Sequence, residues 1–258
     1  GKGATMSRFA ISSWSLDGLL NAGLPLDAVP AQMVQRGLRT LELCHFHLPS
    51  TEDADLQAFR QQLAAAGVEL RSLLIDTGDI AAADPTLAAA ELDKIQRWIA
   101  VAAALGAQQV RIAAGQQAPT PEVIERSAEH LRACAEVASS YGLRTITENW
   151  LRTGEQPADL LAILDKCNGK VGLCADTGNA EATPDKYATL AQLLPRASSV
   201  HFKARYRADG TVDDMDAQRC AELMHQAHFE GVITLIYADK HDEWAGIEQL
   251  RAVLEPLV

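Results

Sequence analysis

The amino-acid sequence predicts a (β/α)₈ barrel that forms one domain over residues 6–258. Eight short apolar runs alternate with segments of helical periodicity, and no linker rich in serine and glycine interrupts them. The length of 258 residues also suits one barrel of this kind. The competing fold is an open, doubly wound sheet. The first run, however, continues into SSWSLDGLLNAG and not into the glycine-rich phosphate loop typical of that fold.

The expected strands are the eight apolar runs, which follow one another at about the spacing of a strand-plus-helix unit. They are residues 8–14, 39–46, 70–76, 108–115, 143–150, 171–178, 198–204 and 232–239.

Capping residues mark the expected helices between these strands. Asp84 with Pro85, and Thr120 with Pro121, predict two helix starts, because proline is tolerated in the first helical turn. Glycines that precede a new strand predict four helix ends. These glycines are Gly37, Gly67, Gly106 and Gly142.

Composition and charge limit the kinds of binding partner and the cellular compartment that we expect. The chain is 48% hydrophobic and 22% charged, as in soluble globular proteins, and no apolar run reaches the ~18 residues of a membrane helix. A net charge of −11 argues against a nucleic-acid partner. Five scattered cysteines without a CxxC pair indicate a reduced, cytoplasmic setting. Residues 1–5 (GKGAT) look like an expression scar.

Three polar residues end three successive apolar runs: Glu148, Asp176 and His201. Parallel barrel strands end at one mouth, where barrel enzymes keep their chemistry, so this spacing predicts that the three side chains converge. Two carboxylates and an imidazole suit Mn²⁺, Co²⁺, Zn²⁺ or, with waters, Mg²⁺. The alternative is that both carboxylates are helix caps or loop anchors that never meet.

Other residues at strand ends are candidates for substrate contacts. Lys203 and Arg205 could hold a carboxylate, a hydroxyl or a phosphate. Trp14 and Trp150 offer flat apolar faces to a sugar, although aromatic packing is also common at barrel rims. His45 and His47 alternate in CHFHLPS, so both could face the site and act on sugar hydroxyls or as acid and base; one of them could instead be packed.

At these positions the chain resembles the xylose isomerase-like barrels, the superfamily of sugar phosphate isomerases and epimerases that also contains endonuclease IV-type repair enzymes. The resemblance lies in TENW, LCADTGN, VHFKAR and TLELCHFH. It implies a divalent metal held by Glu148, Asp176 and His201, and a proton moved between adjacent carbons through an enediolate. It also implies pairing into homodimers or homotetramers.

The chain departs from the family pattern at the last strand. The family's final glutamate, a metal ligand and the second proton carrier, corresponds to Ile236, and two family histidines correspond to Trp150 and Asn179. A metal held by three residues could therefore be weak or absent. Side chains that could replace the missing base are Tyr237, Asp239, His45 and His47.

Glu42 in the second run is a further site residue by the same resemblance. A regular strand cannot point Glu42, His45 and His47 inward together, because successive side chains alternate. We expect Glu42 to be buried in the barrel and paired with a cation, for which Arg111 on the fourth run is the candidate.

These observations predict a metal-dependent isomerase or epimerase of a small sugar, sugar phosphate or polyol. Glu148, Lys203 and His45 are the expected catalytic residues. The expected substrate contacts are Trp14, His47, Arg111, Trp150, Arg205 and Asp239. The alternatives are a lyase such as a dehydratase, which needs only one base, and a barrel that has lost catalysis and serves as a binding subunit. A DNA-repair endonuclease fits an acidic chain with seven histidines least well.

Overall fold

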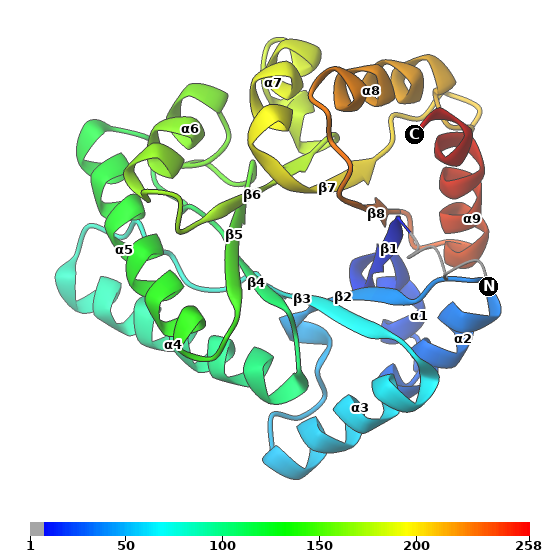
Figure 1. Ribbon diagram of the computed structural model, residues 1–258, viewed down its shortest axis with the longest axis horizontal. Coiled ribbons are helices and arrows are strands. Elements are labelled where there is room, and N and C mark those ends of the chain that lie inside the picture. Colours follow the sequence, from blue (N-terminus) through cyan, green and yellow to red (C-terminus); the bar gives the residue numbers. More distant parts are fainter. Residues whose placement is uncertain (1–7) are drawn as a thin grey trace.

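The computed structural model, which describes residues 8–258, is a closed barrel of eight parallel strands in the order β1 to β8, and it confirms the predicted (β/α)₈ fold. Figure 1 shows the helices surrounding the ring of strands, with β1 beside β8. The expectation of an expression scar at residues 1–5 lies outside the described residues.

Each of the eight strands overlaps one of the apolar runs of the sequence. The strands are β1 (Phe9–Ser12), β2 (Thr40–Cys44), β3 (Glu69–Ile75), β4 (Gln109–Ile112), β5 (Arg144–Glu148), β6 (Gly172–Asp176), β7 (Ala197–Lys203) and β8 (Val232–Ile236). The helices are α1 (Asp17–Asn21), α2 (Val29–Gln35), α3 (Asp53–Ala66), α4 (Pro85–Leu105), α5 (Pro121–Ser140), α6 (Pro157–Lys166), α7 (Lys186–Leu193), α8 (Asp214–Gln226) and α9 (Glu243–Leu254).

Local capping chemistry sets the helix boundaries as the sequence predicts. Asp84 and Thr120 are the N-caps of α4 and α5, and their side chains accept backbone N–H groups of the first turn. Gly106 ends α4 in the left-handed conformation, with φ of 78°. Short loops then lead from each helix into the next strand.

Strand residues of opposite parity face two different environments. Leu41, Leu43 and Phe202 belong to the apolar cluster between barrel and helices, whereas their neighbours Glu42 and His201 are buried polar residues. Because side chains alternate along a strand, these polar residues point into the barrel. Polar groups buried there need hydrogen-bond or ion-pair partners. Polar residues inside the barrel can therefore position the side chains at its mouth.

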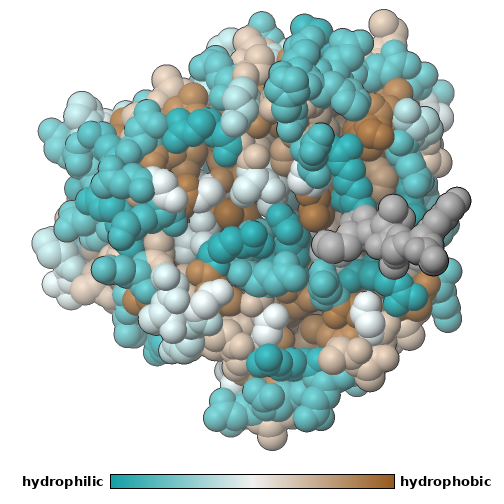
Figure 2. Space-filling view, viewed as in Figure 1, coloured by the Kyte–Doolittle hydropathy of each residue, from teal (hydrophilic) through white to brown (hydrophobic). Residues whose placement is uncertain are grey.

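The outer surface of the described chain is mainly polar. In Figure 2 hydrophilic residues cover most of the visible face, and hydrophobic surface shows between them. Over residues 8–258, no helix has the length and apolar character needed to cross a membrane.

Phe202 tests the apolar layer without touching the polar interior. We expect Phe202→Ala to lower the free energy of unfolding by about 3–5 kcal/mol, because it opens a cavity where the ring is fully buried. Leu87→Ala, on a half-exposed side chain, should change it by less than about 0.5 kcal/mol. Urea unfolding of both variants makes the measurement. Equal losses would contradict this account of the core.

Candidate active site

The carboxyl ends of the strands enclose a cavity of about 620 Å³ at the barrel mouth. Its walls come from all eight strands or the residues that closely follow them. They are formed by Ser12, Trp14, Cys44, His45, Phe46, Leu74, Asp76, Thr77, Arg111, Glu148, Trp150, Asp176, Asn179, His201, Lys203 and Ile236.

The three predicted metal ligands converge at the floor of this cavity. Nδ1 of His201 lies 3.3 Å from Oε2 of Glu148 and 3.8 Å from Oδ2 of Asp176. All three side chains are buried. The alternative that the two carboxylates never meet is therefore excluded by the geometry. Asp176 also accepts the backbone N–H groups of Gly178 and Asn179, so it organises the following turn as well as facing the cavity.

Glu42 holds the other side of the His201 ring from inside the barrel. Its Oε1 lies 2.9 Å from Nε2 of His201 and accepts a hydrogen bond from the hydroxyl of Thr234. Burial raises the pKa of Glu42, but the charge and hydrogen bond of His201 outweigh it, and the pKa falls to about 2. Glu42 is thus buried as expected, but its cationic partner is His201 and not Arg111.

Arg111 is paired with two other carboxylates. Its Nη2 donates to Oδ1 of Asp76 at 2.6 Å, and its Nε lies 3.2 Å from Oε1 of Glu148. The guanidinium carbon lies 4.8 Å from the centre of the Trp150 ring. Burial disfavours the guanidinium charge, yet Asp76 and Glu148 raise the pKa of Arg111 above its ordinary value. Arg111 is therefore a fixed cation beside Glu148.

The two carboxylates at the cavity floor have opposite pKa shifts. Burial raises the pKa of Glu148, but His201 and Arg111 reverse the effect and lower it to about 2. Burial and the neighbouring charge of Glu148 raise the pKa of Asp176 to about 7. The charge of Glu148 is thus compensated, whereas that of Asp176 is not.

The donor set fits a divalent cation. Glu42 occupies Nε2 of His201, which turns Nδ1 towards Glu148 and Asp176, as outer carboxylates do for metal-bound histidines. The uncompensated carboxylate of Asp176 is the kind of group that a cation relieves. In catalytic metal sites three protein ligands commonly bind the ion, and a water molecule or the substrate fills the remaining coordination position. Within the described chain, Cys174 also lies close to Glu148 and His201, and burial raises the pKa of its thiol to about 12.

Five further residues predicted to act at the site line the cavity. They are Trp14, His45, Arg111, Trp150 and Lys203. Nζ of Lys203 lies 3.3 Å from the amide oxygen of Asn179, and no carboxylate of residues 8–258 forms an ion pair with it. Ile236 also lies in the wall, so β8 contributes an aliphatic side chain to the cavity.

His47 lies away from the cavity because β2 ends at Cys44. A short 3₁₀ turn over His45–His47 follows, so strand alternation no longer applies. The two ring nitrogens of His47 lie 2.7 Å from Ser13 Oγ and 2.7 Å from Asp17 Oδ1. The expected substrate contact by His47 is therefore not seen, and the conflict of parity with Glu42 disappears.

Two predicted contacts from the loops after β7 and β8 also lie outside the cavity walls. Arg205 forms a two-point ion pair with Glu181, at 2.9 Å and 3.0 Å. Asp239 is exposed, and Tyr237 donates its hydroxyl to the carbonyl of His241. Of the side chains considered as replacement bases, His45 is the one that reaches the cavity.

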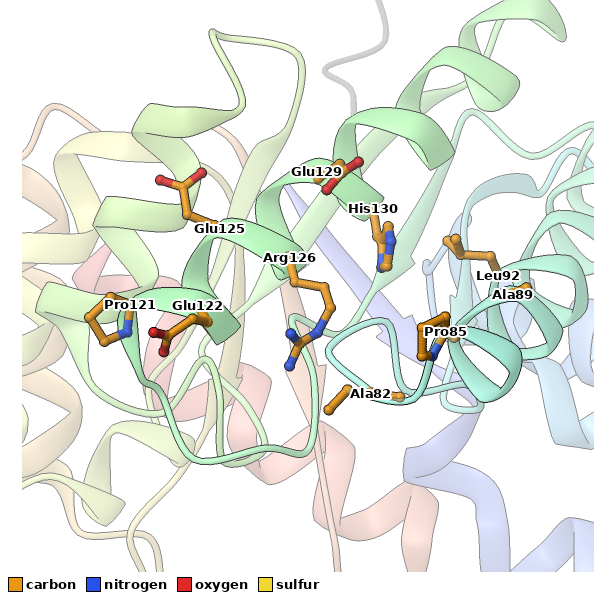
Figure 3. A pocket seen from close by; sticks show the side chains of 12 residues that line it. Ala82, Pro85, Ala89, Leu92, Pro121, Glu122, Glu125, Arg126, Glu129 and His130 are labelled. Carbon is orange, nitrogen blue, oxygen red and sulfur yellow. The ribbon is translucent and has the colours of Figure 1, made fainter.

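Asp76 is a site residue that the sequence analysis missed, although it ends the third apolar run as Glu148 ends the fifth. The loop after Asp76 is held by α5. Arg126 donates to the carbonyl of Ala81, and His130 contacts the carbonyl of Ile80. Figure 3 shows both side chains reaching from α5 towards this loop, beside a second hollow at the ends of α4 and α5.

The ion pair of Arg111 and Asp76 can be tested by a double-mutant cycle. We expect Arg111→Met to lower the free energy of unfolding by about 3–5 kcal/mol, because Asp76 and Glu148 lose a buried cation. Asp76→Asn should recover part of the loss, with a coupling energy of about 0.5–3 kcal/mol in urea unfolding. The exposed pair of Arg196 and Asp165 is the control, with a coupling energy below about 1 kcal/mol. Equal coupling in both pairs would contradict the assigned burial.

Solved structures of similar fold extend over the whole chain. One is described as L-ribulose 3-epimerase, with 19% identity, a TM-score of 0.79, and coverage of 98% of this chain and 96% of that one. A D-tagatose 3-epimerase-like protein has 17% identity, a TM-score of 0.77, and coverage of 97% and 98%. A probable 3-DHS dehydratase, AsbF of Bacillus anthracis, has 14% identity, a TM-score of 0.72, and coverage of 97% and 98%.

At these identities the structural matches establish the fold alone. No curated protein gives a significant match to the sequence. The family model described as the xylose isomerase-like TIM barrel matches residues 30–257, which is most of the chain. The chain therefore belongs to the xylose isomerase-like TIM barrel family.

Proposed function

We propose that this protein is a metal-dependent isomerase or epimerase of a small sugar or related hydroxy-carbonyl compound. The observation that carries the proposal is the convergence of Glu148, Asp176 and His201 on the floor of an open cavity, with Nδ1 of His201 facing both carboxylates. The activities named for the L-ribulose and D-psicose 3-epimerase structures support it as analogies of fold and family.

Glu148, Asp176 and His201 would hold the metal, which when bound supplies a Lewis acid for the substrate oxygens. Glu148 is the proposed proton carrier, and Arg111 beside it keeps that carboxylate ionised. Lys203, which has no carboxylate partner in the described chain, would anchor a substrate oxygen or carboxylate. Trp14 and Trp150 would flank the carbon chain.

Ile236 restricts which reactions of this class are efficient. Epimerisation inverts a carbon, so a proton must leave one face and return to the other, and this requires a proton carrier on each side. An aldose–ketose isomerisation can move the proton along one face with one base. A dehydration needs one base to remove the proton as the hydroxyl departs. Ile236 therefore favours isomerisation, with dehydration as the second candidate.

Elemental analysis of protein purified without chelators or a metal-binding tag tests the metal centre. We expect about one Mn, Co, Zn or Mg per chain, bound by the three residues that converge, and we expect Glu148→Ala to lose it. Glu125→Ala, on an exposed glutamate of α5, is the matched control and should keep it. Protein that stays metal-free after soaking in Mn²⁺ would refute the proposed centre and favour a binding role for the barrel.

Ile236→Glu tests the missing proton carrier. D-fructose, D-psicose, D-tagatose and L-ribulose would be incubated with the Mn²⁺-loaded protein in D₂O and followed by NMR. We expect the natural chain to exchange deuterium or isomerise, and Ile236→Glu to gain inversion at the adjacent carbon by about 10²–10⁴-fold. Rapid inversion by the natural chain would mean that another group supplies the second proton.

The same incubations separate the two candidate functions. Dehydration of a β-hydroxy ketone forms a conjugated enone, which appears as new ultraviolet absorbance. Absorbance without deuterium exchange into the remaining sugar would favour the dehydratase, and neither signal with any compound would contradict the isomerase proposal.

A further inference from the structure

His45 lines the cavity, and its two ring nitrogens have different surroundings. It directly follows β2, at the first position of the 3₁₀ turn, and lies in the cavity wall. The backbone N–H of Asp76 donates to its Nδ1 at 3.1 Å. For Nε2, no hydrogen-bond partner is found among residues 8–258.

The contact with Asp76 fixes the position of the ring proton. A backbone amide always carries its hydrogen, so the nitrogen that it approaches must offer a lone pair. Nδ1 of His45 is therefore unprotonated, and a neutral ring carries its proton on Nε2. The backbone of Leu74 is a second hydrogen-bonding neighbour of His45, but the amide hydrogen that Asp76 directs at Nδ1 leaves no room for a ring proton on that nitrogen.

Aromatic neighbours hold the ring in this orientation. The ring centre lies 4.8 Å from that of Trp98, at an angle of 69°, and 5.4 Å from that of Phe46, at 84°. Both are edge-to-face contacts, which restrict rotation of the ring. Because Nδ1 faces the β3 backbone and the ring borders the cavity, Nε2 is the atom left to meet a substrate.

The surroundings also disfavour the charged form of His45. Burial lowers the pKa of His45, Asp76 and the backbone hydrogen bond with Leu74 raise it, and the positive charge of Arg111 lowers it again. The balance is a lowered pKa. His47 is the other ionisable group that acts on it. A second proton would also have to occupy Nδ1, against the amide hydrogen of Asp76.

We propose that His45 acts as a neutral hydrogen-bond donor, giving Nε2–H to the substrate oxygen where negative charge develops, and not as a carrier of protons. This inference rests on the proposed function and assigns His45 the part of an oxyanion donor in it. It also explains why His45 cannot replace the base lost at Ile236, although it reaches the cavity.

The ring state can be measured without any turnover. Long-range ¹H–¹⁵N correlation spectra of the labelled protein, with His45 assigned by its loss in His45→Gln, report the tautomer. We expect a neutral Nε2–H ring at neutral pH, with protonation only below the ordinary pKa of a histidine. His225, an exposed histidine whose Nε2 lies 2.8 Å from the carbonyl of Leu257, is an internal reference. An Nδ1–H tautomer, or titration of His45 near its ordinary pKa of about 6.5, would overturn the inference.

Kinetics on whichever sugar of the panel reacts provides the second measurement. The amide nitrogen of a glutamine reaches about as far as Nε2 and donates a hydrogen bond, but it carries no proton between groups. We expect His45→Gln to stay within about 10-fold of the natural chain, and His45→Ala to lose about 10²–10³-fold in kcat. We expect the dependence of kcat on pH to show no step from titration of His45, so that the natural chain and His45→Gln have the same profile.

Equal losses in His45→Gln and His45→Ala, together with a limb that disappears from the pH profile, would mean proton transfer and overturn the donor role. Absence of turnover with every sugar would count against the proposed function instead. The ring spectrum would then still decide whether His45 has the fixed, neutral tautomer.

Discussion

The site depends on the ion pairs that His201 forms with Glu42 and Glu148. Glu42 holds Nε2 from the barrel interior and Glu148 faces Nδ1 from the mouth, at 2.9 Å and 3.3 Å. Burial alone would make the imidazolium unfavourable, but the facing carboxylates raise the pKa of His201 well above its ordinary value. Buried charges are costly in a barrel interior, and this arrangement lowers the cost for Glu42 and Glu148, because both carboxylates face the ring of His201. The contact of Nε2 with Glu42 also orients Nδ1 towards the cavity. The contacts that stabilise the buried ring therefore also place it for the proposed metal site.

Asp76 positions two further residues of the cavity wall, Arg111 and His45. Its carboxylate binds Arg111, which compensates Glu148, and its backbone N–H fixes the ring of His45. Asp76, which directly follows β3, therefore holds Arg111 beside the proposed proton carrier and fixes the ring of the proposed donor. The bonds from Arg126 and His130 to the following loop hold this residue's surroundings in place from the outer layer. A substitution in α5 can thus reach the site through the loop without contacting the cavity.

The fold and the floor of the site could be predicted from the sequence because both depend on local patterns. Strand ends are marked by apolar runs, and parallel strands bring their carboxyl ends together, so Glu148, Asp176 and His201 had to converge once the barrel closed. The partner of Glu42 could not be predicted, since His201 lies 159 residues away and the choice between two cations depends on barrel register. His47 was misplaced because nothing in CHFHLPS announces that the strand stops at Cys44. Arg205 follows the strand alternation, but Glu181 competes for it.

Ile236 decides which proton transfers the proposed site can support, because its side chain cannot accept a proton. Two facing carboxylates would share the task of moving a proton across a substrate, whereas here one wall offers Glu148 and the other an aliphatic side chain. His45, the remaining ionisable side chain considered for that task within the cavity, is committed to donation by the Asp76 amide. In the proposed reaction, proton movement would therefore be confined to one face of the substrate, with Lys203 and His45 as donors to its oxygens. A site with one base and several fixed donors suits reactions in which charge must be stabilised more than protons must be exchanged, and for this reason isomerisation and dehydration are more consistent with this chain than epimerisation.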